Sequence, residues 1–343
     1  MVTRRAVLKA AGTSGLAIAA GLPTTATATA AVPDADVLVL VEKSAHAVGF
    51  FDAGSGQRLA TVALPQFPHE LVVDSRGEYA YVGHYGVRMS SDTGEGGAAI
   101  FVLDLARREL VRTISTAPFN RVHGIRIDAR DRLYALSEEK AVLLGFDAPR
   151  TDTAPTRAVH TGGIKTHLFS LSRDGERAYV TGLLSHTVSL VRPYDAATPP
   201  VVASPGQLPE SSCLSQDEKV LFVGARKTPA VVALDARTLA VRKVYEVDGD
   251  PLRVYPYGED RLLVTDIVRK TVTALSTDLR PLWSVQCTGI PSGVALHPAK
   301  PLAYVSELGT NQVSVLDLTT RRITSSFPTG LDPDSAAVLT PRR

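Results

Sequence analysis

Cysteine, methionine and tryptophan are scarce in this chain. Its 343 residues include 2 Cys, 2 Met and 1 Trp. Two cysteines are too few for a disulfide framework or for a cysteine-based metal site. Because Cys213 and Cys287 fall in different repeats of the sequence, we expect two separate buried thiols.

Blocks of like charge are also absent, and the 37 basic and 35 acidic residues are spread along the chain. A nucleic acid or an anionic membrane surface is bound by clustered Lys and Arg, so this composition argues against both partners. Hydrophobic residues make up 44% of the chain, which is ample for a buried core. We expect a monomer that binds a small molecule, with no nucleic-acid partner.

No apolar run is long enough to span a membrane, and the first 30 residues have the layout of a signal peptide. Paired Arg4 and Arg5 precede a mildly apolar segment and an Ala-x-Ala site at residues 28–30. The stretch "TRRAVLK" resembles the twin-arginine export motif, which implies export of a folded protein to the periplasm or the extracellular space. We expect a signal peptide at 1–30, a single domain at 31–343 and no stable membrane insertion.

The rest of the chain repeats one unit, in which a short apolar strand, a polar loop, an alternating strand and a turn recur. The unit is visible in "ERAYVTGLLSHTVSLV", "KVLFVGARKTPAVVALDARTLAVRKV" and "PLAYVSELGTNQVSVLDLTTRRITSSF". Seven such units of about 40 residues have the length of four-stranded propeller blades. Helical periodicity is absent outside the signal segment.

The first unit lacks its innermost strand, because "DVLVLVE" already matches the second strand of the other units. The missing first strand is matched by "DPDSAAVLT", residues 332–340. A ring needs its ends joined, since two sheet edges otherwise stay unpaired. The sequence therefore predicts an all-β, seven-bladed β-propeller of four-stranded blades, closed when the C-terminal strand joins the first blade.

The phrases "AYV", "SRDGERAYV" and "DLTTRRI" resemble the YVTN-repeat propellers, particularly the exported YncE-like proteins, over about residues 36–340. The resemblance implies the fold without naming an activity, because related seven-bladed propellers include lactonases and lyases. Patterns similar to "PHE" and "HGI" recur in the same blades of YncE-like proteins, which favours a site there.

Histidines gather where the first strands of the blades are predicted to begin. In a propeller, these starts share one mouth of the central channel with the ends of the second strands. The first-strand ring is His69, His123, His167, Glu210, Leu252, Ser292 and Asp334, and the second-strand ring is Glu42, His84, Glu138, Gly182, Ala225, Asp266 and Glu307. The offset between the rings is 15 residues in five of six continuous blades, which supports the alignment.

Three adjacent imidazoles beside a carboxylate are ligands that transition metals prefer. We predict that His69, His123, His167 and Glu210 bind a divalent transition metal (Zn, Fe, Mn or Cu), which would activate water or a substrate oxygen. Glu210 or Glu138 would act as general base. Without a metal, the same residues would form a polar site for a small molecule, or would be structural and bond to a neighbouring blade.

Further residues are expected to surround this site. Arg121 and Lys165 would receive an anionic group, with solvation at the surface as the alternative. The glycine-rich insertion at 86–99 is long enough to fold over the mouth as a lid, with a disordered loop as the alternative. The residues expected to orient the ligands or to add negative charge are His84, Glu42, Asp266 and Glu307.

The sequence thus predicts a metal-dependent enzyme of hydrolase, lyase or oxygenase type that acts on a small molecule. Two alternatives stay open: a metal-free lactonase- or lyase-like enzyme, and a non-catalytic propeller that binds a ligand or a protein.

Overall fold

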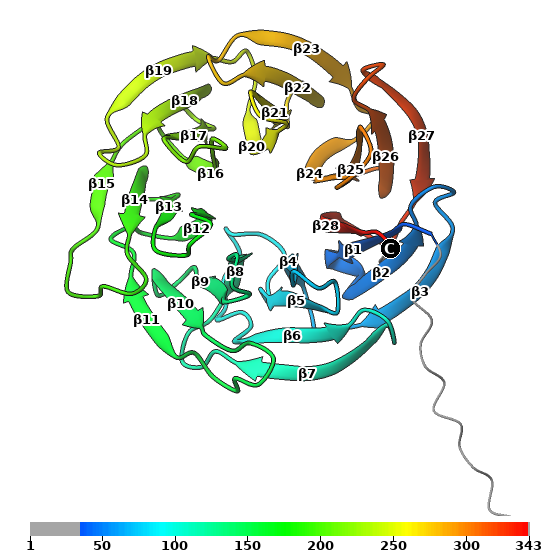
Figure 1. Ribbon diagram of the computed structural model, residues 1–343, viewed down its shortest axis with the longest axis horizontal. Coiled ribbons are helices and arrows are strands. Elements are labelled where there is room, and N and C mark those ends of the chain that lie inside the picture. Colours follow the sequence, from blue (N-terminus) through cyan, green and yellow to red (C-terminus); the bar gives the residue numbers. More distant parts are fainter. Residues whose placement is uncertain (1–34, 342–343) are drawn as a thin grey trace, which may run out of the picture. The chain divides into compact units, whose positions relative to one another are not determined.

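Four antiparallel strands, repeated seven times, make up residues 35–341, the part of the chain described by this computed structural model. The seven sheets are blades around one axis, and the first strand of each blade lies nearest to that axis (Figure 1). Among the described residues one helical element occurs, the 3-10 turn η1 (Lys43–Ala45). The all-β, seven-bladed propeller is therefore confirmed, whereas the predicted signal peptide at 1–30 lies outside the described residues.

The strands follow the chain from the axis outward in every blade after the first. The first three blades consist of β28 (Pro333–Leu339), β1 (Val37–Glu42), β2 (Ala47–Asp52) and β3 (Arg58–Ala63); β4 (Pro68–Val73), β5 (Tyr79–His84), β6 (Ala99–Asp104) and β7 (Glu109–Ser115); and β8 (Val122–Ile127), β9 (Leu133–Ser137), β10 (Val142–Phe146) and β11 (Arg157–His160). The fourth and fifth blades consist of β12 (Thr166–Leu171), β13 (Ala178–Gly182), β14 (Thr187–Val191) and β15 (Val201–Ala203); and β16 (Pro209–Leu214), β17 (Val220–Ala225), β18 (Ala230–Asp235) and β19 (Val241–Glu246). The last two blades consist of β20 (Pro251–Tyr257), β21 (Arg261–Asp266), β22 (Thr271–Ser276) and β23 (Pro281–Gln286); and β24 (Ile290–Leu296), β25 (Leu302–Leu308), β26 (Gln312–Asp317) and β27 (Arg322–Pro328).

The first blade combines strands from both ends of the described chain. β28 pairs antiparallel with β1, from Val37 opposite Leu339 to Glu42 opposite Pro333. This ladder gives β1 the partner that it would otherwise lack at the axis. Closure of the ring by the C-terminal strand is thus confirmed.

The hydrophobic core lies between neighbouring blades, in seven clusters. The "AYV" tyrosines add a directed contact to this packing. Tyr179 donates a hydrogen bond to the carbonyl of Ala236 in the next blade (2.8 Å), and Tyr304 donates to the carbonyl of Ala53 (3.0 Å). A buried aromatic ring with a bonded hydroxyl therefore fixes one blade against the next, which explains why the motif recurs.

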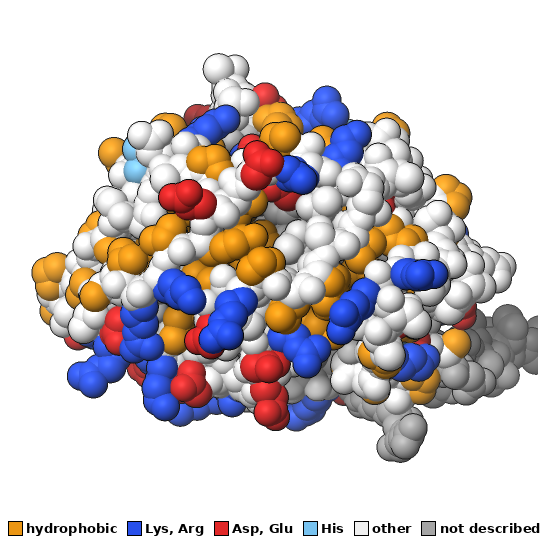
Figure 2. Space-filling model, turned by 90° about the horizontal axis from the view of Figure 1, so that it is seen from above, with side chains coloured by type: hydrophobic (Ala, Val, Ile, Leu, Met, Phe, Trp, Pro, Cys, Tyr) orange, Lys and Arg blue, Asp and Glu red, His pale blue; other side chains and the backbone are white. Residues whose placement is uncertain are grey.

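Cys213 and Cys287 are free and buried, as expected. On the face shown in Figure 2, side chains of both charges are interspersed with hydrophobic patches. Within residues 35–341, no helical segment has the length and apolar character needed to cross a bilayer.

Candidate functional site

Each blade has a register shift near the start of its first strand, and this shift decides which side chains face the channel. In the second blade Leu71 lies opposite Val82, but the next pair is Pro68 opposite His84. Opposite residues of an antiparallel pair point to the same face, and adjacent residues point to opposite faces. The bulge therefore turns His69 toward the channel and His84 away from it.

All seven members of the first-strand ring line one cavity of about 640 Å³ at this mouth. The three histidines come from β4, β8 and β12, the first strands of three consecutive blades. Asp334 of β28 precedes them around the ring, and Glu210 of β16 follows them. Five consecutive blades thus contribute one continuous polar wall.

The imidazoles form a row along this wall. The ring centroids of His69 and His123 are 4.2 Å apart, and those of His123 and His167 are 3.9 Å apart. Oδ2 of Asp334 lies 2.9 Å from Nδ1 of His69, and Oε1 of Glu210 lies 2.9 Å from Nε2 of His167. A carboxylate therefore closes the histidine row at each end.

The three histidines differ in protonation. Burial lowers the pKa of His69, against the opposing effect of Asp334. Burial, aided by the two flanking imidazoles, holds the pKa of His123 well below its usual value. At His167 burial is outweighed by Glu210, and the pKa rises to about 9. At neutral pH a protonated His167 thus stands beside a neutral His123.

The carboxyl of Glu210 responds in the opposite sense. Burial would raise its pKa, but His167 and then Arg226 lower it to about 2. Nη1 of Arg226 lies 3.3 Å from Oε2 of Glu210. At the other end of the row, Nζ of Lys43 lies 3.3 Å from Oδ2 of Asp334. Each terminal carboxylate therefore also carries a basic side chain.

Several buried polar atoms beside the row have no hydrogen-bond partner. They include both ring nitrogens of His123, Nδ1 of His167, the hydroxyl of Tyr85 and both carboxylate oxygens of Glu138. Oε1 of Glu138 lies 3.6 Å from Nδ1 of His167, and neither His123 nor Glu138 is exposed to solvent. An unpartnered buried polar group costs about 1–3 kcal/mol, so a ligand, proton donor or ion that reached these atoms would be stabilised.

Glu138 occupies a different position from the one that the alignment gave it. β9 ends at Ser137, which lies opposite Val122 as His84 lies opposite Pro68. Glu138 is therefore the first residue of the turn that follows the second strand. In five of the other blades the first turn residue lines the cavity: Lys43, Tyr85, Leu183, Arg226 and Ile267. In the seventh blade Leu308 does so, as the last residue of β25 and the first beyond its pairing with β26.

The alignment of the repeats placed the strand ends at the cavity, one residue before the residues that line it. The signal that would have found these residues is the common length of the connections, since in six of the seven blades four residues lie between the last paired residues of the second and third strands. Strand alternation then requires the first turn residue, and not the strand end, to share the face of the first-strand ring.

Glu42, Asp266 and Glu307 do lie at the predicted strand ends, but within the described chain none of them lines the cavity. Each carboxylate accepts a hydrogen bond from the loop that leads into the first strand of its own blade. The donors are the backbone N–H groups of Gly330, Asp250 and Gly289, at 2.6, 2.9 and 2.6 Å respectively. These residues therefore fix the strand starts.

Residues 86–99 fold against the mouth, and residues 88–91 line the cavity. Arg121 holds this loop and is 2% exposed, so its side chain is not solvated as the alternative interpretation required. Its guanidinium donates to the carbonyls of Ser90, Asp92 and Gly94 at 3.2, 2.5 and 2.8 Å. Nη1 of Arg121 also lies 2.8 Å from Oε1 of Glu139, so the chain itself supplies partners for both terminal nitrogens of this guanidinium.

His84 and Lys165 have different surroundings. A Cβ added at Gly97 would lie 2.2 Å from the ring of His84, so this histidine packs under the 86–99 loop. Lys165 lines the cavity, and its Nζ lies 3.6 Å from Glu139. The structure thus brings Lys165 to the histidine cavity and leaves His84 behind it.

Among the described residues, His69, Glu70 and Asp334 are the group of three candidate metal ligands whose ligand atoms lie within 4.8 Å of one another. Nη2 of Arg253 lies 2.8 Å from Glu70, and Lys43 contacts Asp334. Because basic side chains already compensate both carboxylates, a divalent cation would be repelled there. We assign this group to an ion-pair network.

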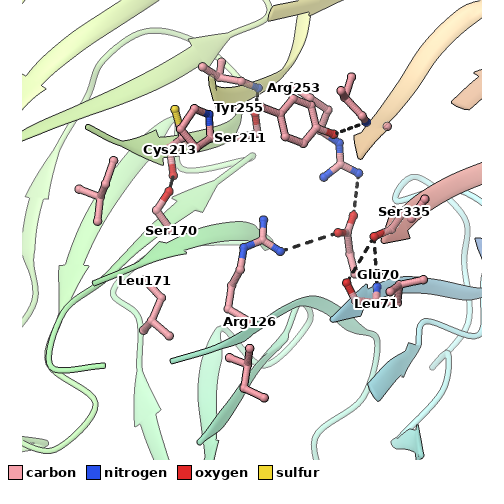
Figure 3. A pocket seen from close by; sticks show the side chains of 18 of the residues that line it. Glu70, Leu71, Arg126, Ser170, Leu171, Ser211, Cys213, Arg253, Tyr255 and Ser335 are labelled. Atoms are coloured by element: carbon pink, nitrogen blue, oxygen red, sulfur yellow. Dashed lines mark hydrogen bonds and ion pairs between the residues drawn. The ribbon is translucent and has the colours of Figure 1, made fainter. Parts of the chain in front are cut away.

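A second cavity of about 610 Å³ opens toward the other mouth of the channel. Figure 3 shows Glu70 between Arg126 and Arg253, which belong to this network. Arg253, Ser292 and Asp334 line both cavities. One layer of polar side chains therefore separates the histidine cavity from the second one.

Comparison with known proteins shows similarity in fold. No family model and no curated protein matches this chain. The dihydro-heme d1 dehydrogenase NirN, solved with DHE, is similar over 90% of this chain at 13% identity and a TM-score of 0.64, and this chain spans 66% of the length of NirN. A Lactobacillus plantarum protein (16% identity, TM-score 0.71, 89% of this chain and 100% of that one) and a candidate 6-phosphogluconolactonase from Bacteroides fragilis (14% identity, TM-score 0.70, 90% and 99%) are also similar.

The fold and the site define a class, the seven-bladed β-propellers with a polar site at one mouth of the channel. At the identities found, the similarity to solved structures supports the fold alone. The narrower resemblance to YVTN-repeat, YncE-like proteins stays a prediction.

Proposed function

We propose that this protein is a small-molecule enzyme that works at the histidine cavity. The observation that carries the proposal is the row from Asp334 through the three histidines to Glu210, on the wall of a cavity of about 640 Å³. Cavities of this size hold small molecules in proteins. Two of the similar structures carry the names of small-molecule enzymes, NirN and the candidate lactonase, so this fold is compatible with such an activity, but the similarity itself extends to the fold alone.

The pKa values favour acid–base chemistry without a metal. Sites that push the pKa values of neighbouring groups apart supply an acid and a base together. Neutral His123 would accept a proton from water or substrate, and the charge on His167 would stabilise an anion that forms beside it. This pair suits the hydrolysis of a lactone or an elimination.

A divalent transition metal is the second candidate, favoured by the unpartnered buried atoms. His123, His167 and Glu138 would supply donor atoms, with His69 and Glu210 beside them, after a shift of these side chains, since the three do not form a group with ligand atoms within 4.8 Å of one another. Nitrogen and oxygen donors without sulfur suit Zn, Fe, Mn or Cu. The ion would displace the proton of His167 and would polarise a substrate oxygen or a bound water.

Elemental analysis of untagged protein decides between the two forms. The metal form predicts about one ion per chain, lost in His123→Ala while the circular dichroism spectrum is unchanged. The metal-free form predicts no ion, together with hydrolysis of small lactones that His123→Ala abolishes.

A matched control is His160→Ala, which replaces an exposed histidine on β11 and should leave the activity unchanged. The outcome against both forms is a protein without metal whose behaviour is the same after replacement of all three row histidines. That result favours a non-catalytic propeller that binds a ligand or a protein.

We also propose that the protein is exported through the twin-arginine route. The support is the stretch "TRRAVLK". Replacement of both Arg4 and Arg5 by Lys should retain the protein in the cytoplasm, as measured by cell fractionation. Unchanged export of this variant would exclude the twin-arginine route.

A further inference from the structure

The histidine cavity has two unlike walls. Beside the end of the histidine row and onward around the ring, apolar side chains from the fourth to the seventh blade form an apolar wall. Its members are Leu183, Leu208, Leu252, Ile267, Ile290 and Leu308. A ligand that fills this cavity therefore needs an apolar part, because water against this wall would be released at a gain in free energy.

The polar wall presents more basic than acidic side chains. Within the described chain, Glu210 and Asp334 are the carboxylates that line the cavity. The basic side chains that line it are Lys43, Arg88, Lys165, Arg226 and Arg253. The other carboxylates that pair with these bases are Asp332, Glu139, Asp250 and Glu70, and they lie outside the lining.

The positive ends of these ion pairs therefore face the cavity, and their negative ends face away from it. Lys43 and Arg226 stand at the two ends of the histidine row. An anionic group placed along the row would interact with both, in surroundings of low dielectric constant.

The rim of the same mouth is apolar. Five strongly exposed hydrophobic side chains occupy the loops that surround it, in the 86–99 loop, before β12 and β28, and after β13 and β21. They are Met89, Ile164, Leu184, Val268 and Leu331, each 55–70% exposed. The apolar wall thus continues to the surface, so that a long apolar group could extend outward from the cavity.

From these three observations we infer that the cavity binds an anion with an apolar chain or ring, its acidic group against the histidine row and its apolar part along the leucine wall toward the rim. The inference rests on the proposed function, since it names the class of ligand of the same cavity. A small inorganic anion would leave the apolar wall in contact with water. A neutral apolar molecule would leave the basic side chains unpaired with any ligand charge.

Calorimetric titration of the full-length protein with octanoate tests the inference. Acetate carries the charge without the chain, and octanamide carries the chain without the charge. Octanoate should bind at least tenfold more tightly than either, because each omits one of the two interactions. Equal affinity for octanoate and octanamide, or for octanoate and acetate, would overturn it, as would no binding of octanoate.

Two variants locate the ligand. Leu252→Ser should weaken octanoate binding roughly tenfold through lost apolar contact and leave acetate unaffected. Lys43→Gln should weaken octanoate but leave octanamide unchanged. The matched controls are Leu282→Ser on the outer strand β23 and Lys227→Gln, which are exposed and do not line the cavity. Equal effects of control and cavity variants would contradict the inference.

The same titration on His123→Ala separates this inference from the proposed function. If octanoate binds to the wild type and to His123→Ala, and the wild type has neither a metal nor lactone hydrolysis, the enzyme proposal fails and the ligand class stands. Enzyme activity that depends on His123, without preference for octanoate, means the reverse.

Discussion

His123 lies at the centre of the histidine row with two buried ring nitrogens that nothing in the structure satisfies. A residue kept for stability would have a partner, as the buried His297 has in Asp36 at 3.0 Å. Unpartnered buried groups cost free energy of folding, and proteins commonly retain such costs where function needs them. This contrast makes His123 the most informative residue of the site.

Replacing His123 by Leu should leave the free energy of unfolding unchanged or raise it by up to about 2 kcal/mol, because both unpartnered nitrogens disappear. His297→Leu, the matched control, should lower it, because the backbone N–H groups of Ala299 and Lys300 lose their acceptor and Asp36 loses one of its two partners. Urea denaturation of both variants measures the difference. A large loss of stability in His123→Leu would show that its imidazole has a structural partner.

The raised pKa of His167 predicts how stability depends on pH. The folded-state pKa of about 9 exceeds the usual 6.5, so the stabilisation is complete below pH 6.5 and is lost as pH rises to 9. For Glu210 the folded-state pKa of about 2 lies below the usual 4.5, so its contribution to stability is lost as the pH falls from 4.5 toward 2.

Urea midpoints of chelator-treated protein between pH 6 and 9.5 should therefore fall above pH 6.5, and His167→Asn should flatten this fall. A wild-type profile that stays flat to pH 9 would mean that His167 is neutral in the folded protein.

At the scale of strands and turns, the sequence identified the elements and misplaced some of the side chains on them. The first strands were located to the residue, so that His69, His123 and His167 share a cavity. The second-strand residues were misplaced because the bulge changes the pairing by one position. The alignment did not use the one signal of the bulge, the proline that stands beside it in five blades: Pro68, Pro209, Pro251, Pro291 and Pro333. His84 consequently packs under the 86–99 loop.

Glu138 is the opposite case, because its position in the blade was assigned wrongly and yet it reaches the site. The alignment placed it at a strand end, whereas it is a turn residue, and its carboxylate lies 3.6 Å from Nδ1 of His167 in the next blade. Contacts between side chains of different blades, such as Arg121 with the loop carbonyls, depend on how the blades are packed and have no local signal in the sequence.

Replacing Arg121 by Leu should release the 86–99 loop from the mouth of the channel. Loss of charged hydrogen bonds to three buried or partly buried carbonyls is expected to cost about 1–3 kcal/mol of stability. Limited proteolysis should then cut within residues 86–99 faster than in wild type. Arg130→Leu, at an exposed position, is the control. Equal cleavage in both variants would show that other contacts hold the loop.

At the scale of the whole molecule, the ring is held by contacts between blades and by one strand exchanged between the chain ends. Chain truncation after Pro328 removes β28, exposes the edge of β1 and opens the cluster shared by the first and seventh blades. We expect this variant to unfold at a lower urea concentration and to aggregate.

A circular permutant tests the same point with the composition unchanged. Residues 329–341 placed before Val37 by a short linker should restore the blade and the wild-type midpoint, because strand β28 needs proximity to β1 and not a particular chain end. Failure of the permutant, with the truncated protein still stable, would contradict this account of closure.

The bulge and turn of each blade form an independent unit, because the bulge sets one cavity-facing side chain and the turn sets the next. In the third blade, one residue fewer lies between the paired parts of the first and second strands than in the second blade, which makes Glu138 a buried turn residue beside His167, while the hydroxyl of Ser137 donates a hydrogen bond to the carbonyl of Asn120. A length change of one residue within one blade can thus alter which side chain follows the second strand at this mouth. The side chains at this mouth, and with them the chemistry of the site, can therefore change one blade at a time.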